Sequence, residues 1–166
     1  NQDHPIPRMR YKLIQSRVLD KNEVFLPLYP EVEKMTASEY ERLRPLILDQ
    51  SIPQIQQQVR QGVISYEDLC RFYLYRIYRY ELDNATTLNT VIALNSGVIE
   101  EARLRDADLK ANPDAPRHPI FGMPVLLKDN INTFDKLHTS AGSLALAHSY
   151  APADAFLVGR LRDAGA

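Results

Sequence analysis

The stretch Pro119-Ile-Phe-Gly-Met-Pro-Val-Leu-Leu-Lys-Asp-Asn-Ile-Asn-Thr133 contains a short apolar run that ends abruptly in a charged pair. The run, residues 125–127, follows a glycine and a proline, and Lys128 and Asp129 come directly after it. An apolar run bounded by turn-forming residues is typical of a short buried strand. Burial favours the neutral form of an ammonium group. The stretch therefore predicts that Lys128 can lose its proton near neutral pH and act as a base.

Five segments of the chain occur in the order and spacing of a known family. Residues 88–95 (Leu-Asn-Thr-Val-Ile-Ala-Leu-Asn) resemble that family's early strand, and residues 101–108 resemble the helix after it. Residues 122–131 are close to its lysine motif, and Thr139-Ser140-Ala141-Gly142-Ser143 matches its next block. Residues 154–166 match the helix that leads to the following strand. Together these segments resemble the amidase signature family, the serine amidases that use a Ser–cis-Ser–Lys triad.

The resemblance covers residues 48–166 and implies that Lys128 is the catalytic lysine. In that family a neutral lysine lies beside a serine in a cis peptide, which relays a proton from the nucleophilic serine. Attack on an amide carbonyl then gives an acyl-enzyme that water hydrolyses. The Gly/Ser-rich segment that carries both serines is absent from this sequence. We therefore expect the polypeptide alone to be inactive, and to need a C-terminal continuation or a complementary chain.

Residues around the lysine are expected to have supporting roles rather than to do chemistry. Asp129 and Asn130 are expected to orient the lysine loop and to cap backbone groups. His138 is expected to be a loop residue, since no Ser-His-Asp arrangement surrounds it. The residues expected to line the pocket or support its wall are Thr139, Ser140, Ala141, Gly142 and Ser143.

Capping patterns predict the helices of the N-terminal half. A Ser or Thr followed three residues later by Glu, Gln or Asp marks a helix start, and this pattern predicts helices over 36–50, 51–62 and 65–81. Pro45 is expected to kink or split the first helix. Cys70 on the third is expected to be a small buried residue. The apolar stripe expected on this third helix is Tyr66, Leu69, Tyr73, Ile77 and Tyr80.

The second half of the sequence predicts strands as well as helices. Residues 89–95 and 125–127 are expected to be strands, separated by a charged, solvated helix that ends near Ala111. A final helix is expected after Ala153-Asp154, with Leu157, Leu161 and Ala164 on one side. This order favours the α/β class, in which a helical N-terminal layer leads into the first strands of a mixed sheet covered by helices.

Two regions follow from these patterns. Residues 1–35 contain four prolines and are predicted to form an irregular N-terminal arm. Residues 36–166 are predicted to be the N-terminal part of a single domain of the amidase-signature type.

Composition excludes several classes of function. Twenty basic and 21 acidic residues give a net charge of −1, so nothing favours nucleic acid or an anionic membrane as a partner. The sequence contains no run of about 18 apolar residues, which is the length needed to span a membrane. The single cysteine excludes an internal disulfide, and the four histidines lack metal-ligand spacing, so we expect neither a metal nor a cofactor. The Asn1 start is compatible with a cytoplasmic protein or with export after signal removal.

Three functions remain open at this stage. The first is hydrolysis of a small-molecule carboxylic amide by the complete enzyme. The second is a glutaminase-type subunit of a tRNA-dependent amidotransferase, although the N-terminal helical region here looks longer than in that protein. The third is a non-catalytic interaction fragment that keeps the fold.

Overall fold

The computed structural model describes residue 5 and residues 20–166. The prediction of an irregular arm falls partly on residues 1–4 and 6–19, which lie outside this described part. Within residues 20–35 the structure has helical turns where irregular backbone was expected. The helices are α1 (Asn22–Phe25), η2 (Leu26–Leu28), α2 (Tyr29–Val32), α3 (Ala37–Ile47), α4 (Ile52–Arg60), α5 (Tyr66–Glu81), α6 (Val98–Ala111), η3 (Leu144–Leu146) and α7 (Phe156–Asp163).

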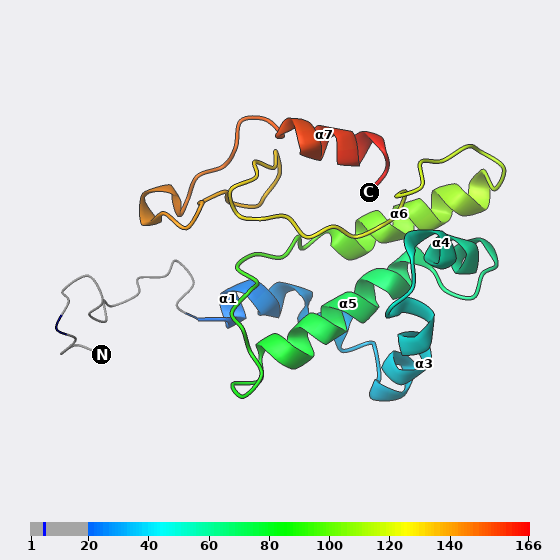
Figure 1. The fold of residues 1–166 in the computed structure, drawn as a ribbon, viewed down its shortest axis with the longest axis horizontal. Coiled ribbons are helices and arrows are strands. Elements are labelled where there is room, and N and C mark those ends of the chain that lie inside the picture. Colours follow the sequence, from blue (N-terminus) through cyan, green and yellow to red (C-terminus); the bar gives the residue numbers. More distant parts are fainter. Residues whose placement is uncertain (1–4, 6–19) are drawn as a thin grey trace.

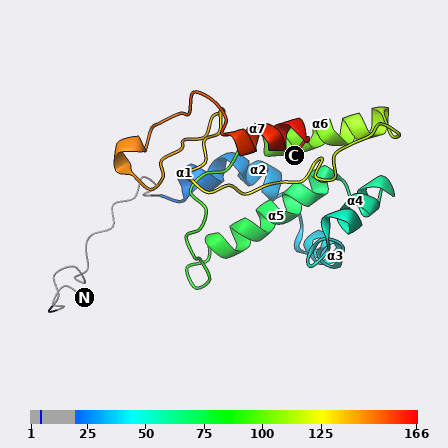
Figure 2. The ribbon, with the colours of Figure 1, turned by 45° about the horizontal axis from the view of Figure 1, so that its top comes forward.

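Helix α5 is the centre of the packing. It contacts α2, α3 and α6, and Figures 1 and 2 show it running between these elements. The Tyr40 ring of α3 stacks on the Phe72 ring of α5 with centroids 4.8 Å apart, and both side chains are buried. The largest fully buried side chains are Tyr40, Tyr66, Phe72, Leu28, Leu43, Ile47, Leu69 and Ile99. The core therefore lies in the helical layer, around α5.

The predicted helix starts are confirmed. The Thr36 N–H donates to the Glu39 carboxylate at 2.8 Å, and the Ser51 N–H donates to the Gln54 side chain at 2.8 Å. The α5 start is equally regular, with Ser65 and Asp68 bonded reciprocally at 3.0 and 2.9 Å. These bonds satisfy N–H groups that a helix leaves without an internal partner.

The end of α4 has the geometry that the sequence predicted at Gly62. Gly62 adopts φ +70°, its N–H bonds to the Val59 carbonyl at 3.0 Å, and the Val63 N–H bonds to the Gln58 carbonyl at 3.0 Å. This pair of bonds is a Schellman motif. Pro45 lies inside α3 without splitting it, and α3 ends at Ile47 rather than near residue 50.

The predicted strands are not present. No strand is formed among residues 20–166, so residues 89–95 and 125–127 are irregular and the mixed sheet is not confirmed. A strand is stabilised by ladder hydrogen bonds to a neighbouring strand, and residues 20–166 contain no second strand that could form such a ladder with these segments. Figure 1 shows residues 112–155 as a long connection interrupted only by η3.

The side chains buried on α5 differ from the predicted stripe. Tyr66 and Leu69 are buried as expected, but Tyr73 and Ile77 are only partly buried and Tyr80 is exposed. The stripe prediction is wrong beyond Leu69 because α5 packs against elements on several sides. The further buried positions are Cys70, Phe72, Leu74, Tyr78 and Glu81, of which Cys70 was predicted. Likewise Val158, rather than the predicted apolar side, is the buried residue of α7.

The charged helix α6 is less solvated than predicted, because one side of it faces α5. The Arg103 guanidinium bonds to Glu67 of α5 at 3.1 Å and to Glu31 of α2 at 2.9 Å. Glu31 also accepts from Lys34 and Arg71, each at 2.6 Å. This cluster of carboxylates and cations ties α2, α5 and α6 together.

The ion cluster makes stability depend on pH in the acid range. The hydrogen bonds from Lys34 and Arg71 lower the pKa of Glu31 to about 2. Because the folded-state pKa is lowered, ionised Glu31 stabilises the fold above about pH 4.5, and this contribution is lost as the pH falls toward about 2. We expect Glu31→Gln to lower the free energy of unfolding at pH 7 by about 1 kcal/mol and to flatten its pH dependence in that window. Urea unfolding at several pH values measures both.

The matched control for this prediction is Glu33→Gln, which removes an exposed carboxylate two positions later. Its unfolding free energy should follow that of the wild type at every pH. If the two variants show the same pH dependence, the Glu31 cluster does not stabilise the fold.

Candidate functional site

Lys128 lies in the long connection after α6, and its side chain is exposed. The apolar run before it is also uncovered, since Val125, Leu126 and Leu127 are 47%, 78% and 36% exposed. The predicted burial of this run is therefore wrong for the described chain. The physical reason is that three apolar residues cannot bury one another, and the described elements leave each of these side chains at least 36% exposed. Water reaches the lysine in this structure.

The start of the Lys128 segment is fixed to the helical layer. Gln56 on α4 is buried, and its Nε2 donates to the carbonyls of Pro119 and Phe121 at 2.9 and 2.7 Å. Its Oε1 accepts from the Tyr66 hydroxyl of α5 at 2.8 Å. These three bonds connect α4, α5 and the connection just before Gly122.

Gly122 adds close packing to these bonds. Its φ is +72°, and a Cβ at this position would lie 2.4 Å from the Tyr66 ring. The Gly122 N–H donates to the Gly165 carbonyl at 2.9 Å, and Arg105 of α6 donates to the same carbonyl at 3.0 Å. The end of α7 therefore meets the Lys128 segment and α6 at one point.

Asp129 holds the other end of the segment. Its carboxylate accepts from the Ser140 N–H at 3.0 Å, from the Ser140 hydroxyl and from the Gly142 N–H at 3.2 Å. Its carbonyl accepts from the Ala141 N–H at 3.0 Å. Ala141 and Gly142 both have positive φ, +50° and +73°, so the loop turns tightly around this carboxylate. Asp129 therefore caps backbone groups of the 139–143 loop.

The structure brings together part of the predicted site. Asp129 and Ser140 are in direct contact, and Ser140 is buried. The Thr139 N–H donates to the Ser149 carbonyl at 3.0 Å. The residues that remain exposed are Lys128, Asn130, Ala141, Gly142 and Ser143. A catalytic role for Lys128, and supporting roles for the others in an active site, stay predictions.

We expect Asp129→Asn to loosen the 139–143 loop. An amide carries less charge than a carboxylate and accepts through one oxygen, so the bonds from Ser140 and Gly142 weaken. Each charge-assisted bond contributes about 1.5–3 kcal/mol, so amide exchange within the loop should become roughly tenfold faster or more. Hydrogen exchange measured by mass spectrometry checks this. Asp163→Asn, which changes an exposed carboxylate on α7, should leave the loop unchanged.

Sequence reasoning missed two side chains that organise this region. Gln56 is polar and lies in a helix rich in glutamine, so nothing in the pattern distinguishes it from its exposed neighbours. Asp106 lies in α6, the helix that the sequence predicted to be charged and solvated. Its carboxylate instead accepts from the N–H groups of Tyr66 and Glu67 at 2.8 and 3.0 Å, and so caps α5 from outside that helix. Burial raises the pKa of Asp106.

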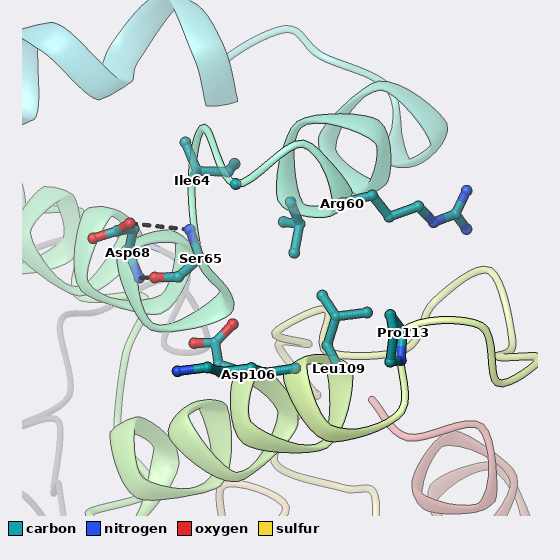
Figure 3. Close-up of a pocket in the computed structure, with 10 residues that line it drawn as sticks. Arg60, Ile64, Ser65, Asp68, Asp106, Leu109 and Pro113 are labelled. Carbon is teal, nitrogen blue, oxygen red and sulfur yellow. Dashed lines mark hydrogen bonds between the residues drawn. The ribbon is translucent and has the colours of Figure 1, made fainter.

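A cavity of about 580 Å³ lies beside the Asp106 carboxylate, where the ends of α4 and α6 meet the start of α5. Figure 3 shows the Asp106 carboxylate between Ser65 and Leu109, with Arg60 pointing away from the centre. The Lys128 segment does not contribute to it. The residues that line it are Val59, Arg60, Gly62, Ile64, Ser65, Asp68, Asp106, Leu109, Lys110 and Pro113.

Comparison with known proteins identifies the family. The Amidase family profile matches residues 69–166, which include Lys128 and the 139–143 loop. The chain belongs to the amidase family. It is 34% identical over 140 residues to a putative amidase from Schizosaccharomyces pombe, a match that covers 84% of this chain and 23% of that protein.

Two other members show the same relation. A glutamyl-tRNA(Gln) amidotransferase subunit from Lysinibacillus sphaericus is 30% identical over 119 residues, which are 72% of this chain and 23% of that protein. The crystal structure of an amidase family protein from Bacillus anthracis str. Ames superposes with a TM-score of 0.79 at 30% identity, and the match covers 89% of this chain and 28% of that one. The chain thus spans about a quarter of the length of these amidase relatives.

Residues 20–166 of this amidase-family chain offer neither a metal site nor a membrane span. No group of three or more His, Cys, Asp or Glu side chains in this described part is placed to hold a metal ion. Nor does any helix of the described chain have the length and apolar character needed to cross a membrane.

Proposed function

We propose that this chain is the lysine-bearing part of an amidase that hydrolyses carboxylic amides through a Ser–cis-Ser–Lys triad, with Lys128 as the proton acceptor. The observation that carries the proposal is the family match over residues 69–166, since Lys128 lies within it. The Asp129 bonds to the 139–143 loop support it, because they give the residue next to Lys128 a defined position.

In the proposed mechanism, Lys128 starts the reaction as a neutral amine. It accepts a proton that the cis serine relays from the nucleophilic serine, whose oxygen attacks the amide carbonyl. The proton then passes to the leaving nitrogen, which departs as an amine or ammonia and leaves an acyl-enzyme. Water hydrolyses that ester with the same groups acting in reverse.

The mechanism requires that Lys128 be shielded from water, because solvation favours the charged ammonium. Lys128 and the run at 125–127 are exposed here. We infer that a further polypeptide segment, either a continuation of this chain or a complementary chain, supplies the serines and covers this surface. This segment would place the lysine in the low-polarity surroundings that a general base of this type needs.

A glutaminase-type amidotransferase subunit is the second candidate. It is favoured by the similarity to the amidotransferase subunit from Lysinibacillus sphaericus. In that case the same lysine and serines would release ammonia from glutamine for a partner protein. Co-purification with further amidotransferase subunits distinguishes this function from simple hydrolysis. If neither a continuation nor a partner chain carried the serines, the non-catalytic interaction role would be favoured instead.

The experiment that tests the proposal combines native mass spectrometry with an amide-hydrolysis assay. The purified species and everything that co-purifies with it are sequenced, and release of ammonia or amine from a set of small amides is measured. A species that carries a Gly/Ser-rich segment and hydrolyses amides supports the proposal. A native species that is a lone 19.0 kDa monomer, with neither a serine-bearing continuation nor a partner chain, overturns it.

A further inference from the structure

A buried amide side chain of the helical layer holds the start of the Lys128 segment, next to the buried side chain of Met123. Gln56 is only 6% exposed, and both hydrogens of its NH₂ group are used, in bonds to Pro119 and Phe121. Its carbonyl oxygen accepts from the Tyr66 hydroxyl, which is itself inside the core. The side chain therefore has one stable orientation, because only its NH₂ group can donate to the two carbonyls.

The Lys128 segment is thus held at both ends. Gln56 fixes residues 119–121 at its start, and Asp129 fixes its end to the 139–143 loop. Between the two clamps, the side chains of residues 124–128 are exposed in this structure. The exposed part of the segment has no packing of its own, so the position of Lys128 depends on the contacts at the two ends, which include the burial of Met123 against the helical layer.

We propose that Gln56 is a positioning residue for Lys128, acting from the helical layer through the carbonyls of Pro119 and Phe121. This inference rests on the proposed function, since it assigns Gln56 a purpose only if Lys128 is the proton acceptor. Proton transfer requires heavy atoms within about 2.6–3.2 Å of one another. A displacement of about 1 Å in a reacting group can cost roughly 100-fold in rate.

The test compares Gln56→Leu with Gln57→Leu. Leucine at position 56 removes all three bonds, whereas Gln57 is exposed on the same helix and serves as the matched control. The first readout is hydrogen exchange of residues 123–131 in this chain. We expect exchange there to become at least about tenfold faster in Gln56→Leu, beyond any change in the buried amides of α5. Gln57→Leu should match the wild type.

The second readout is kinetic and uses the amidase-active species. We expect Gln56→Leu to lower kcat by about 10- to 100-fold with KM changed by less than roughly twofold. A merely structural role would reduce the amount of folded enzyme but leave the kcat of the folded fraction unchanged. Active-site titration of the folded enzyme separates the two effects.

Tyr66→Phe covers the case in which Gln56→Leu does not fold. It keeps the ring that packs against Gly122 and removes only the hydroxyl bonded to Gln56. We expect Tyr66→Phe to produce the same two effects, faster hydrogen exchange of residues 123–131 and a lower kcat, each smaller than in Gln56→Leu. Accelerated exchange together with a lowered kcat supports the inference. Unchanged exchange, or accelerated exchange with wild-type kcat, overturns it while the proposed function stands. Absence of amide hydrolysis in a wild-type species that includes the serine-bearing segment overturns the proposed function itself, and with it the role of Gln56.

Discussion

Substitution of Lys128 by alanine is expected to lower kcat/KM of the complete amidase by about 10³-fold or more without disturbing the fold. In the proposed mechanism no other group of this chain accepts the proton, and a positioned general base contributes about 10²–10⁴-fold. When several residues act as one catalytic unit, removing one of them removes most of the rate enhancement of the whole unit. The side chain is exposed in this chain, so its removal should change the free energy of unfolding of this chain alone by less than about 0.5 kcal/mol. Steady-state kinetics and urea unfolding measure the two quantities.

Lys128→Arg separates a base from a cation at this position. Arginine keeps the positive charge but is not deprotonated in proteins, so it cannot accept the proton. We therefore expect Lys128→Arg to be as inactive as the alanine variant. Lys136→Ala, which changes an exposed lysine in the following loop, is the control and should keep wild-type activity. Full activity in Lys128→Ala would contradict the proposed mechanism. Activity in Lys128→Arg but not in Lys128→Ala would show that Lys128 acts through its positive charge and not as a base.

The helical layer could be predicted because its signals are local. Capping boxes at Thr36, Ser51 and Ser65 and the glycine at position 62 act within a few residues of the backbone groups that they satisfy. The strands could not be predicted correctly in the same way. An apolar run such as 125–127 becomes a strand only with a paired neighbour, and the sequence of the run does not say whether that neighbour is present.

The same distinction applies to the candidate site. Asp129 was predicted to cap backbone groups, and its partners lie in a loop that is close in sequence. The roles of Gln56 and Asp106 depend instead on contacts between residues 39 to 65 positions apart in the sequence. Short polar patterns carry no information on such distant partners, so the α4 amide and the external cap of α5 became visible only in the structure.

Gly122→Ala is expected to destabilise the fold strongly. At φ +72° an added Cβ costs about 1–2 kcal/mol, and it would lie 2.4 Å from the Tyr66 ring. That ring is buried and its hydroxyl is bonded to Gln56, so it cannot move aside without breaking the bond. Overpacking of this kind adds about 1–3 kcal/mol. We therefore expect the free energy of unfolding to fall by about 2–5 kcal/mol.

Gly62→Ala isolates the contribution of the clash. Gly62 has nearly the same φ, +70°, but no atom lies within 4 Å of the position that its Cβ would occupy. Only the backbone cost of about 1–2 kcal/mol applies there. Urea unfolding followed by circular dichroism should show a clearly larger loss for Gly122→Ala. Equal losses of unfolding free energy in the two variants would mean that the Tyr66 ring shifts at little energetic cost. The start of the Lys128 segment would then be less firmly fixed than its contacts indicate.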